Sequence, residues 1–410
     1  MQKEREKSPF QVAFKLKDLC RKCGYCDNWI NCPGLENCTG CGSCTVACPH
    51  EARILVPDKR ERKHVKIKVE GETYFVPERI TVLKALETIG YRFSSLPEKD
   101  AIFAPCRTGG CWSCAVEIDG MLKPSCITPV KENMNIKIKE AENFTPVRLV
   151  RGFSGHPVGG VGTPAELKRI QGYIEVAFFA QGCCFRCPSC QNWHITYASK
   201  GELLTPKEAA KKITEYRKIH NVDRMAISGG ESTLNKPWLL WYIKEAKNLN
   251  KDEKARIHVD SNGAVLTSDY IDALLEKGMT DIGIDVKGLE LETFMKITNL
   301  HDKELAKRYF ETEWNSVKYI IDNYWGDVFL GLGIPYNPAL ISLDEVRKIG
   351  EKIAKWEPNI QVCALDYRPE FRAKHLIWPT IAEMMKVKEV LDETGLKNAM
   401  CQTKGGHIGP

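Results

Sequence analysis

The stretch GCCFRCPSCQNWH, residues 182–194, places four cysteines within eight positions. Cys183, Cys187 and Cys190 follow the spacing C-x3-C-x2-C. Three thiolates can hold a 4Fe-4S cubane and leave one iron without a protein ligand. That open iron could bind a small molecule next to a source of electrons. Cys184 is then the spare thiol, which we expect to be a small buried residue. A zinc site and a disulfide pair are the alternatives.

An earlier group of eight cysteines lies between Cys20 and Cys48. Its first part reads C-x2-C-x2-C, and its last part reads C-x2-C-x2-C-x3-C followed by proline. This is the run of bacterial ferredoxins, in which the fourth cysteine ligates the other cluster. We therefore predict one 4Fe-4S cluster on Cys20, Cys23, Cys26 and Cys48, and a second on Cys32, Cys38, Cys41 and Cys44. The segment resembles a two-cluster bacterial ferredoxin, although its interval from Cys26 to Cys32 is longer than usual. Structural zinc sites are the alternative.

A third group, Cys106, Cys111, Cys114 and Cys126, reads C-x4-C-x2-C-x11-C. The first part of this spacing is that of plant-type 2Fe-2S loops. Alternating residues before it predict a hairpin that turns near Gly71, and a helical stretch follows over 80–90. Hairpin, helix and cluster loop occur in the order of a β-grasp fold. The segment resembles the 2Fe-2S ferredoxin domains of succinate dehydrogenase and complex I, with zinc as the alternative.

The remainder of the chain alternates strand and helix patterns. Six apolar strands are predicted: IEVAFFA, MAISGG, IHVDSNG, DIGIDVKG, VFLGLGIP and QVCALDY. Helix starts are indicated at Thr205, Ser268 and Ser342. We predict an α/β fold, a partial (β/α)6 TIM-like barrel with its chemistry at the carboxyl ends of the strands. The polar, glycine-rich motifs fall at those ends.

The motif CFRCPSCQN resembles the radical SAM superfamily, and within it the branch of glycyl-radical-enzyme activases. The resemblance implies that the open iron is chelated by S-adenosylmethionine (SAM). SGGES, residues 228–232, is similar to the GGEP motif of that family, which implies that Gly229, Gly230 and Glu231 hold the amino group of SAM. Ser232 replaces the usual proline. An ordinary strand-to-helix glycine turn is the alternative.

Two further motifs carry the resemblance. DSNG, residues 260–263, is similar to the DTNG motif of activases, and DVKG follows the next strand. By this resemblance Asp260, Ser261 and Asp285 would bind a monovalent cation beside SAM, Asn262 would join the cofactor site, and Lys287 would supply a counter-charge. Each could instead be a cap or turn residue.

The chain departs from the activase pattern at two places. Activases have an aromatic residue that packs on adenine just before the last cluster cysteine, and this chain has Ser189 at that position. We predict that Trp193 binds the cofactor in its place. Near the last predicted strand, activases have a histidine facing SAM, where this chain has Tyr367 or Arg368. These departures affect the substrate end of the site more than the SAM end.

Length and composition set the organisation. The 410 residues suffice for several domains: a two-cluster ferredoxin-like domain at 1–60, a 2Fe-2S domain at 61–140, a linker at 141–170 and the barrel at 171–410. Eighteen cysteines without a secretory signal indicate a reducing, cytoplasmic location. The net charge of +6 is interspersed, so neither nucleic acid nor membrane is an expected partner. The final GGHIGP is expected to be a mobile tail.

The expected function is reductive cleavage of SAM to methionine and a 5′-deoxyadenosyl radical that abstracts hydrogen. The expected cofactors are three 4Fe-4S clusters, one of which binds SAM, one 2Fe-2S cluster, SAM itself and a monovalent cation. The N-terminal clusters would carry electrons from a ferredoxin or a reductase. We slightly prefer a metabolite, peptide or RNA as substrate over activation of a protein partner by a glycyl radical. A pure electron carrier is the third hypothesis, and it has no need of an open cluster site.

Overall fold

The computed structural model describes residues 10–157 and 161–410. Within these ranges the chain forms two compact units. The first unit comprises the described residues up to 149 together with the short segments 181–183 and 193–203, and the second unit comprises the rest. Cys183 therefore belongs to the unit with the N-terminal cysteines, whereas Cys187 and Cys190 belong to unit two.

The first part of unit one is a small sheet with two short helices. β1 (Gln11–Lys15) pairs antiparallel with β2 (Arg53–Pro57), and α1 (Tyr25–Asn28) and α2 (Ser43–Ala47) lie between them in the sequence. A glycine with positive φ immediately precedes each helix. Glycine reaches this conformation without the cost that a side chain adds, so the cysteine loops can turn sharply into both helices.

The second part of unit one is a five-stranded sheet in the order β4, β3, β9, β7, β8. Its strands are β3 (His64–Val69), β4 (Glu72–Pro77), β7 (Ala115–Ile118), β8 (Met121–Pro124) and β9 (Met134–Lys137). The predicted hairpin of β3 and β4 turns at Gly71, and β9 pairs parallel with β3. The helix α3 (Val82–Thr88) supplies Val82, Ala85 and Leu86 to the core over this sheet. The loop that carries Cys106, Cys111 and Cys114 therefore lies between α3 and β7 in the sequence.

Three short elements complete this part of the chain. β5 (Phe93–Ser94) and β6 (Ile102–Phe103) pair in parallel, and a 3-10 helix, η1, spans Lys139–Asn143. Two further elements of the chain, α5 (Trp193–Thr196) and β12 (Glu202–Leu204), follow the central cysteine motif.

Unit two is built on a parallel sheet, and all six predicted strands are present in it. In order across the sheet they are β11 (Ile174–Ala180), β13 (Arg224–Gly229), β14 (Arg256–Ser261), β15 (Asp281–Asp285), β16 (Phe329–Tyr336) and β17 (Gln361–Asp366). A seventh parallel strand, β18 (Asn398–Thr403), follows β17. The prediction missed β18 because its sequence NAMCQT has no alternation or apolar run of strand type.

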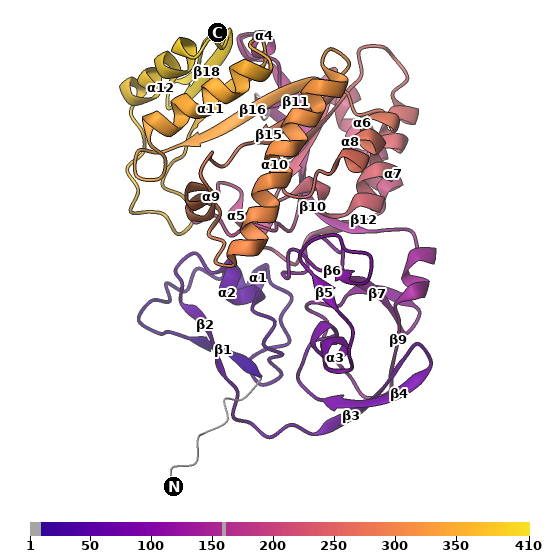
Figure 1. Ribbon diagram of the computed structural model, residues 1–410. Coiled ribbons are helices and arrows are strands. Elements are labelled where there is room, and N and C mark those ends of the chain that lie inside the picture. The colour runs from indigo at the N-terminus through magenta and orange to yellow at the C-terminus, as the bar shows by residue number, and fades with distance from the viewer. Residues whose placement is uncertain (1–9, 158–160) are drawn as a thin grey trace. The chain divides into compact units, whose positions relative to one another are not determined.

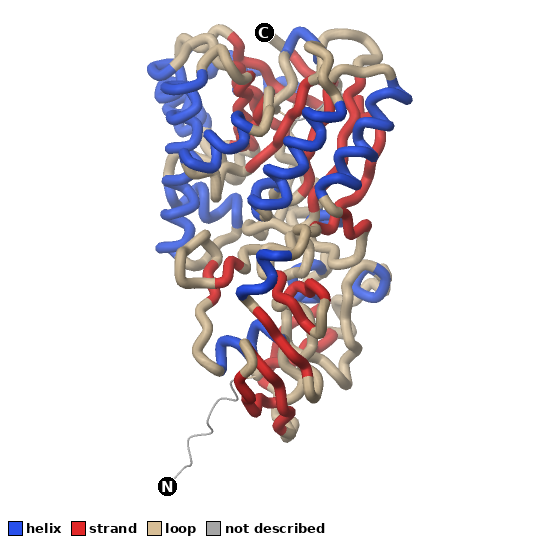
Figure 2. Tube along the Cα trace, turned by 90° about the vertical axis from the view of Figure 1, so that its right-hand side faces the viewer, coloured by secondary structure: helices blue, strands red, loops and turns tan. Residues whose placement is uncertain are grey.

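Helices alternate with the strands along the chain, as the sequence pattern predicted. Figure 2 distinguishes the helices (blue) from the strands (red). They are α4 (Ala165–Lys168), α6 (Pro206–His220), α7 (Lys236–Leu249), α8 (Ser268–Glu276), α9 (Leu291–Thr298), α10 (Lys303–Tyr324), α11 (Leu343–Trp356) and α12 (Ile381–Glu393), and η2 (Ser232–Leu234) is a 3-10 turn. α6, α7 and α8 neighbour one another, as do α11 and α12 (Figure 1). Their apolar faces and one face of the sheet form the largest core of the molecule.

The helix starts agree with the sequence signals to within one residue. Thr205 caps α6 in a capping box with Glu208, and Ser342 caps α11. The cap of α8 is Thr267, and the predicted Ser268 is the first helical residue. No helix in the described ranges has both the length and the apolar character needed to cross a membrane.

The segment 141–170, which was expected to be a linker, contains structure that belongs to the sheet. β10 (Arg148–Pro157) pairs antiparallel with β11, with an irregularity between Arg151 and Ser154 where Gly152 has φ 77°. The glycines that mark this segment as a linker in the sequence serve here in the strand irregularity, at Gly152, and in close packing, at Gly162. Residues 158–160 of that segment lie outside the described ranges.

The chain that follows β10 covers the inner face of the sheet. Residues 161–165 lie against three glycines of β15 and β16, and a β-carbon added at Gly331 would lie 2.0 Å from the carbonyl oxygen of Val161. Gln361 holds the segment by donating to the carbonyls of Val161 (3.1 Å) and Thr163 (2.9 Å). Alternate strand residues face the helices, so this inner face is filled by a backbone segment in place of large side chains.

The end of the chain also differs from expectation. The expected mobile tail forms β19 (Gly406–Ile408), which pairs antiparallel with β18 and sets His407 opposite Gln402. Burial lowers the pKa of the His407 imidazole to about 4. His407 therefore lies on the last hairpin of the sheet.

Candidate functional site

The thiols assigned to the second 4Fe-4S cluster lie near one another in unit one. Burial raises the pKa of the Cys44 thiol to about 12, and the neighbouring thiols of Cys41, Cys32 and Cys38 contribute further. The backbone N–H of Ala13 points at the Cys38 sulfur at 3.3 Å. Mutually repelling thiolates that receive amide hydrogen bonds are a donor set that iron would neutralise, so these four residues fit a cluster.

The first 4Fe-4S set is less closely grouped. Arg53 directs a guanidinium nitrogen at the Cys26 sulfur (3.6 Å), while burial raises the pKa of the Cys26 thiol. A backbone hydrogen bond from Lys22 lowers the pKa of the Cys20 thiol. In the described ranges neither this set nor the other cysteine groups have the arrangement of a site for a single metal ion. The assignment of Cys20, Cys23, Cys26 and Cys48 to one cluster stays a prediction from spacing.

The 2Fe-2S quartet is fully buried and tightly grouped. The sulfurs of Cys106 and Cys111 lie 3.1 Å apart. Hydrogen bonds from Cys111 and Cys126 hold the pKa of the Cys106 thiol well below its usual range, whereas burial raises that of Cys111. The loop wraps through residues with positive φ, including Gly109 (82°). Such a loop brings backbone amides towards sulfur, and the amide of Thr108 lies 3.5 Å from the Cys106 sulfur.

The central motif contacts the neighbouring loops of unit two. Cys184 is buried, and the side-chain amide of Asn262 approaches its sulfur at 3.6 Å. Asn192 donates to the carbonyl oxygen of Gly229 at 3.2 Å. Cys187 and Cys190 are half-buried, and the N–H of Cys190 donates to the carbonyl of Cys187. The motif is thereby tied to the glycine loop after β13 and to the loop after β14.

Glu231 joins those two loops. Its carboxylate accepts from the amide of Thr233 (3.0 Å), the hydroxyl of Ser261 (2.8 Å) and the amide of Asn262 (2.7 Å). Glu231 is fully buried, and burial raises the pKa of its carboxyl. The structure thus gives Glu231 a positioning role, because it fixes the ends of β13 and β14 relative to each other. Its contact with SAM stays a prediction.

Asp260, Asp285 and Lys287 lie at the carboxyl ends of β14 and β15. The Lys287 ammonium lies 2.9 Å from an Asp285 carboxylate oxygen. Burial would lower the pKa of Lys287, but the charges of Asp285 and of the Cys187 thiolate raise it, so the ammonium stays charged. Neighbouring glycines leave room for both carboxylates, since a β-carbon at Gly283 would lie 2.6 Å from Asp260 Oδ1.

Two residues of the site were missed by sequence reasoning. His258 is buried and its Nε2 lies 2.9 Å from Asp260 Oδ1. Burial alone would lower the pKa of His258, but Asp260 and Glu175 raise it to about 9. Glu313 of α10 is fully buried, accepts from the amide of Lys287 at 3.0 Å, and has its carboxyl pKa raised by burial.

The departures from the activase pattern have defined positions. Trp193 packs on Tyr25 with ring centroids 4.9 Å apart, so it has a partner in the N-terminal domain, and its stacking on adenine stays a prediction. The Arg368 guanidinium lies 3.1 Å from the Gln191 side chain, and the Ser189 hydroxyl donates to the Arg368 carbonyl. Arg368 therefore contacts the cysteine motif from the loop after β17, as do the backbone amides of Arg372 and Ala373, which donate to the Pro188 carbonyl at 2.9 and 3.0 Å.

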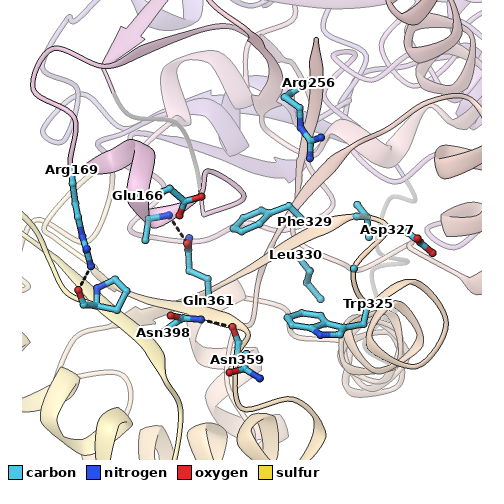
Figure 3. Close-up of a pocket in the computed structure, with 14 residues that line it drawn as sticks. Glu166, Arg169, Arg256, Trp325, Asp327, Phe329, Leu330, Asn359, Gln361 and Asn398 are labelled. Carbon is cyan, nitrogen blue, oxygen red and sulfur yellow. Dashed lines mark hydrogen bonds between the residues drawn. The ribbon is translucent and has the colours of Figure 1, made fainter. Parts of the chain in front are cut away.

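A cavity of about 690 Å³ lies at the opposite, amino ends of the strands. Arg256, Phe329, Gln361 and Asn398, the first residues of β14, β16, β17 and β18, line it (Figure 3). None of the motifs discussed above reaches it. The chemistry-bearing residues are instead gathered at the carboxyl ends of the strands, as the barrel prediction expected.

Three family models match the chain. Residues 178–339 match the radical SAM superfamily, residues 62–141 a 2Fe-2S iron-sulfur cluster binding domain, and residues 35–54 a 4Fe-4S binding domain. The last match includes four of the eight early cysteines, Cys38, Cys41, Cys44 and Cys48.

Among known proteins, one of Methanocaldococcus jannaschii, named as a candidate glycyl-radical enzyme activating enzyme, is 23% identical over 220 residues, 53% of this chain and 76% of that protein. NADP-reducing hydrogenase subunit HndD of Solidesulfovibrio fructosivorans is 36% identical over 97 residues, 22% of this chain and 17% of that subunit. Among solved structures, HydG, a maturase of the FeFe-hydrogenase, has 13% identity and a TM-score of 0.40, covering 54% of this chain and 50% of that chain.

Proposed function

Because residues 178–339 match the radical SAM superfamily and the N-terminal part matches 4Fe-4S and 2Fe-2S binding domains, we propose that the chain is a radical SAM enzyme that cleaves SAM reductively with electrons delivered through its N-terminal clusters. Cys183, Cys187 and Cys190 would hold the SAM-binding cluster. When bound, that cluster supplies one electron to the sulfonium of SAM, whose S–C5′ bond breaks to give methionine and a 5′-deoxyadenosyl radical. The carrying observation is the spacing of these cysteines beside loops that Glu231 holds together.

The protein's own residues would orient SAM at the carboxyl ends of β13 to β15. The backbone of Gly229 and Gly230 would face the amino group of SAM, while Asp260 and Asp285 offer carboxylate oxygens for a monovalent cation. Lys287, kept charged by Asp285 and Cys187, would balance the carboxylate of SAM. Ser189, Gln191 and Arg368 form the side of the motif where a substrate would approach.

The electron supply would come from unit one. Ferredoxin-like domains transfer electrons through clusters whose potentials depend on cluster type, charge and hydrogen bonds to sulfur. A ferredoxin or a reductase would reduce these clusters in a reducing cytoplasm, where fifteen of the eighteen cysteines would serve as cluster ligands.

The experiment that tests this proposal is anaerobic reconstitution with iron and sulfide, reduction with dithionite, and addition of SAM. Mass spectrometry should detect 5′-deoxyadenosine and methionine. Cys187→Ala should abolish both products while the visible and EPR signals of the N-terminal clusters remain. SAM cleavage by the Cys187→Ala enzyme at the wild-type rate would contradict the assignment.

The substrate has two candidates. A metabolite, peptide or RNA remains our preferred class, and activation of a protein partner by a glycyl radical is favoured by the name of the M. jannaschii relative. Adding cell extract separated into large and small molecules would distinguish them. Stimulation of 5′-deoxyadenosine formation by the large fraction, lost on protease treatment, would indicate a protein substrate. Stimulation by the small fraction alone would indicate a metabolite.

A further inference from the structure

Two backbone loops of unit one pack against each other without any side chain between them. One is the 2Fe-2S loop at Gly110 and Cys111, and the other is segment 181–183, which ends at Cys183. A β-carbon added at Gly110 would lie 2.5 Å from the Gly182 nitrogen, and one added at Gly182 would lie 2.7 Å from the Cys111 nitrogen. Both glycines are therefore required by the contact itself.

The contact is close to ligand cysteines on both sides. The β-carbon position of Gly182 lies 3.0 Å from the β-carbon of Cys111 and 3.2 Å from that of Cys106. Gly182 is also the chain neighbour of Cys183. A single residue thus separates two buried cysteines of the 2Fe-2S quartet from the first cysteine of the SAM-cluster motif.

Segment 181–183 is firmly held at this contact. The Gln181 amide donates to the carbonyl of Leu149 (3.0 Å), and the Gly182 amide donates to that of Thr196 (2.8 Å). The Gln181 side chain, which is fully buried, donates to the carbonyl of Ala198 at 3.0 Å. Segment 181–183 is therefore buried and fixed by hydrogen bonds, which keeps the two loops close together at this contact.

The other N-terminal domain approaches the motif less directly. Tyr25 lies between Cys23 and Cys26, packs on Trp193 with ring centroids 4.9 Å apart, and donates to the carbonyl of His194 at 3.0 Å. Two aromatic rings intervene there, and Trp193 is three residues beyond Cys190. The 2Fe-2S side thus offers the shorter path in bonds and contacts.

We propose that the Gly110–Gly182 contact is the point at which the electron enters the SAM-cleaving site, which makes the 2Fe-2S domain the last carrier. This inference rests on the proposed function. In the step, one electron leaves the reduced centre held by the Cys106 quartet, which is oxidised, and the centre at Cys183, Cys187 and Cys190 is reduced. No bond or proton is transferred. Dithionite, or a reduced ferredoxin-type protein, is the reductant that starts the sequence.

Gly110→Ala tests the proposal. Gly110 does not have a positive φ, so alanine should fit the backbone of the loop and disturb only the contact with Gly182. The matched control is Gly405→Ala, where an added β-carbon meets nothing closer than 3.7 Å. Each reconstituted full-length protein is reduced with dithionite, freed of excess reductant, mixed with SAM and freeze-quenched. EPR then follows the reduced 2Fe-2S signal while mass spectrometry follows 5′-deoxyadenosine.

In wild type and Gly405→Ala the reduced 2Fe-2S signal should decay as product forms. In Gly110→Ala it should form normally and then persist, and excess dithionite should restore SAM cleavage by reducing the site directly. If Gly110→Ala holds too little 2Fe-2S cluster, Gln181→Ala, which frees the same contact from the other side, should show the same persistence.

If the reduced 2Fe-2S signal decays at the wild-type rate in both Gly110→Ala and Gln181→Ala, the inference is overturned and the proposed function is left intact. Wild-type decay in Gly110→Ala together with persistence in Trp193→Leu would move electron entry to the Tyr25 side and overturn it as well. Absence of 5′-deoxyadenosine from wild type under excess dithionite would overturn the proposed function and this inference together.

Discussion

Arg224 neutralises two buried acids on the inner face of the sheet. Its guanidinium lies 3.1 Å from Glu175 and 2.9 Å from Asp281, and all three side chains are buried. Removing Arg224 takes away the charge that both carboxylates share and leaves Glu175 with His258 and Asp281 with Arg256, so Arg224→Met should lower the free energy of unfolding by about 3–5 kcal/mol. Urea denaturation measures this. The exposed pair of Arg347 and Glu393 is the control, since Arg347→Met should cost at most about 1 kcal/mol.

The Glu175 carboxyl should make the free energy of unfolding depend on pH. Burial alone would raise the pKa of its carboxyl, but His258 and Arg224 lower it from 4.5 to about 2. A carboxyl with a depressed folded pKa stabilises above its unfolded pKa and loses that contribution as the pH falls through the folded value. The difference in unfolding free energy between wild type and Glu175→Gln should therefore shrink as the pH falls from 4.5 towards 2. A difference that stays constant over this range would contradict the assignment.

At this same scale the sequence predicts some residues and not others. Cysteine spacing is local and needs no tertiary contact, so the groups around Cys44 and Cys106 could be assigned in advance. His258 could also have been found, because it lies two residues before Asp260 and strand alternation sets both on one face. Glu313 could not, since its partner Lys287 is 26 residues away in sequence and only helix packing brings them together.

Among elements, β15 and β16 carry glycines because segment 161–165 covers them. A β-carbon at Gly331 would lie 2.0 Å from the carbonyl oxygen of Val161. Overpacking of this kind costs about 1–3 kcal/mol, so Gly331→Ala should lower the free energy of unfolding by that amount. Chemical denaturation tests this, with Gly405→Ala expected to be neutral. Equal stability of both variants would show that the segment does not occupy this face.

The elements themselves were predictable where they repeat. Apolar runs bounded by glycine gave the six strands from β11 to β17 because buried parallel strands need continuous apolar sequence. β10 and β18 lack that signal. Their pairing partners, β11 and β17, supply the register, and each strand lies one place in from the edge of the sheet, beside the short strands β12 and β19.

For the whole molecule, we expect iron removal to affect the two units differently. Unit one has small sheets and short helices around its cysteine groups, whereas unit two has the largest apolar core. Because the unfolded chain has no preformed ligand set, the free energy of metal binding contributes directly to folding. After oxidation and chelation of iron, hydrogen–deuterium exchange should rise sharply in 20–57 and 104–127, while β13 to β17 should keep their protection. Uniform loss of protection would contradict this division.

Segment 161–165, which covers the inner face of the sheet, limits where the sheet can be joined to another domain in a gene fusion. Segment 161–165 precedes the radical SAM match, which begins at residue 178, yet it seals Gly283 and Gly331 and accepts from Arg224 through the Gly162 carbonyl (2.8 Å). A gene fusion that joined a foreign electron-transfer module at residue 178 would carry over a sheet whose buried charges faced water. A segment that natural or laboratory recombination can transfer intact must therefore begin before β10. A domain boundary placed at residue 178 from the sequence match would leave out β10 and segment 161–165.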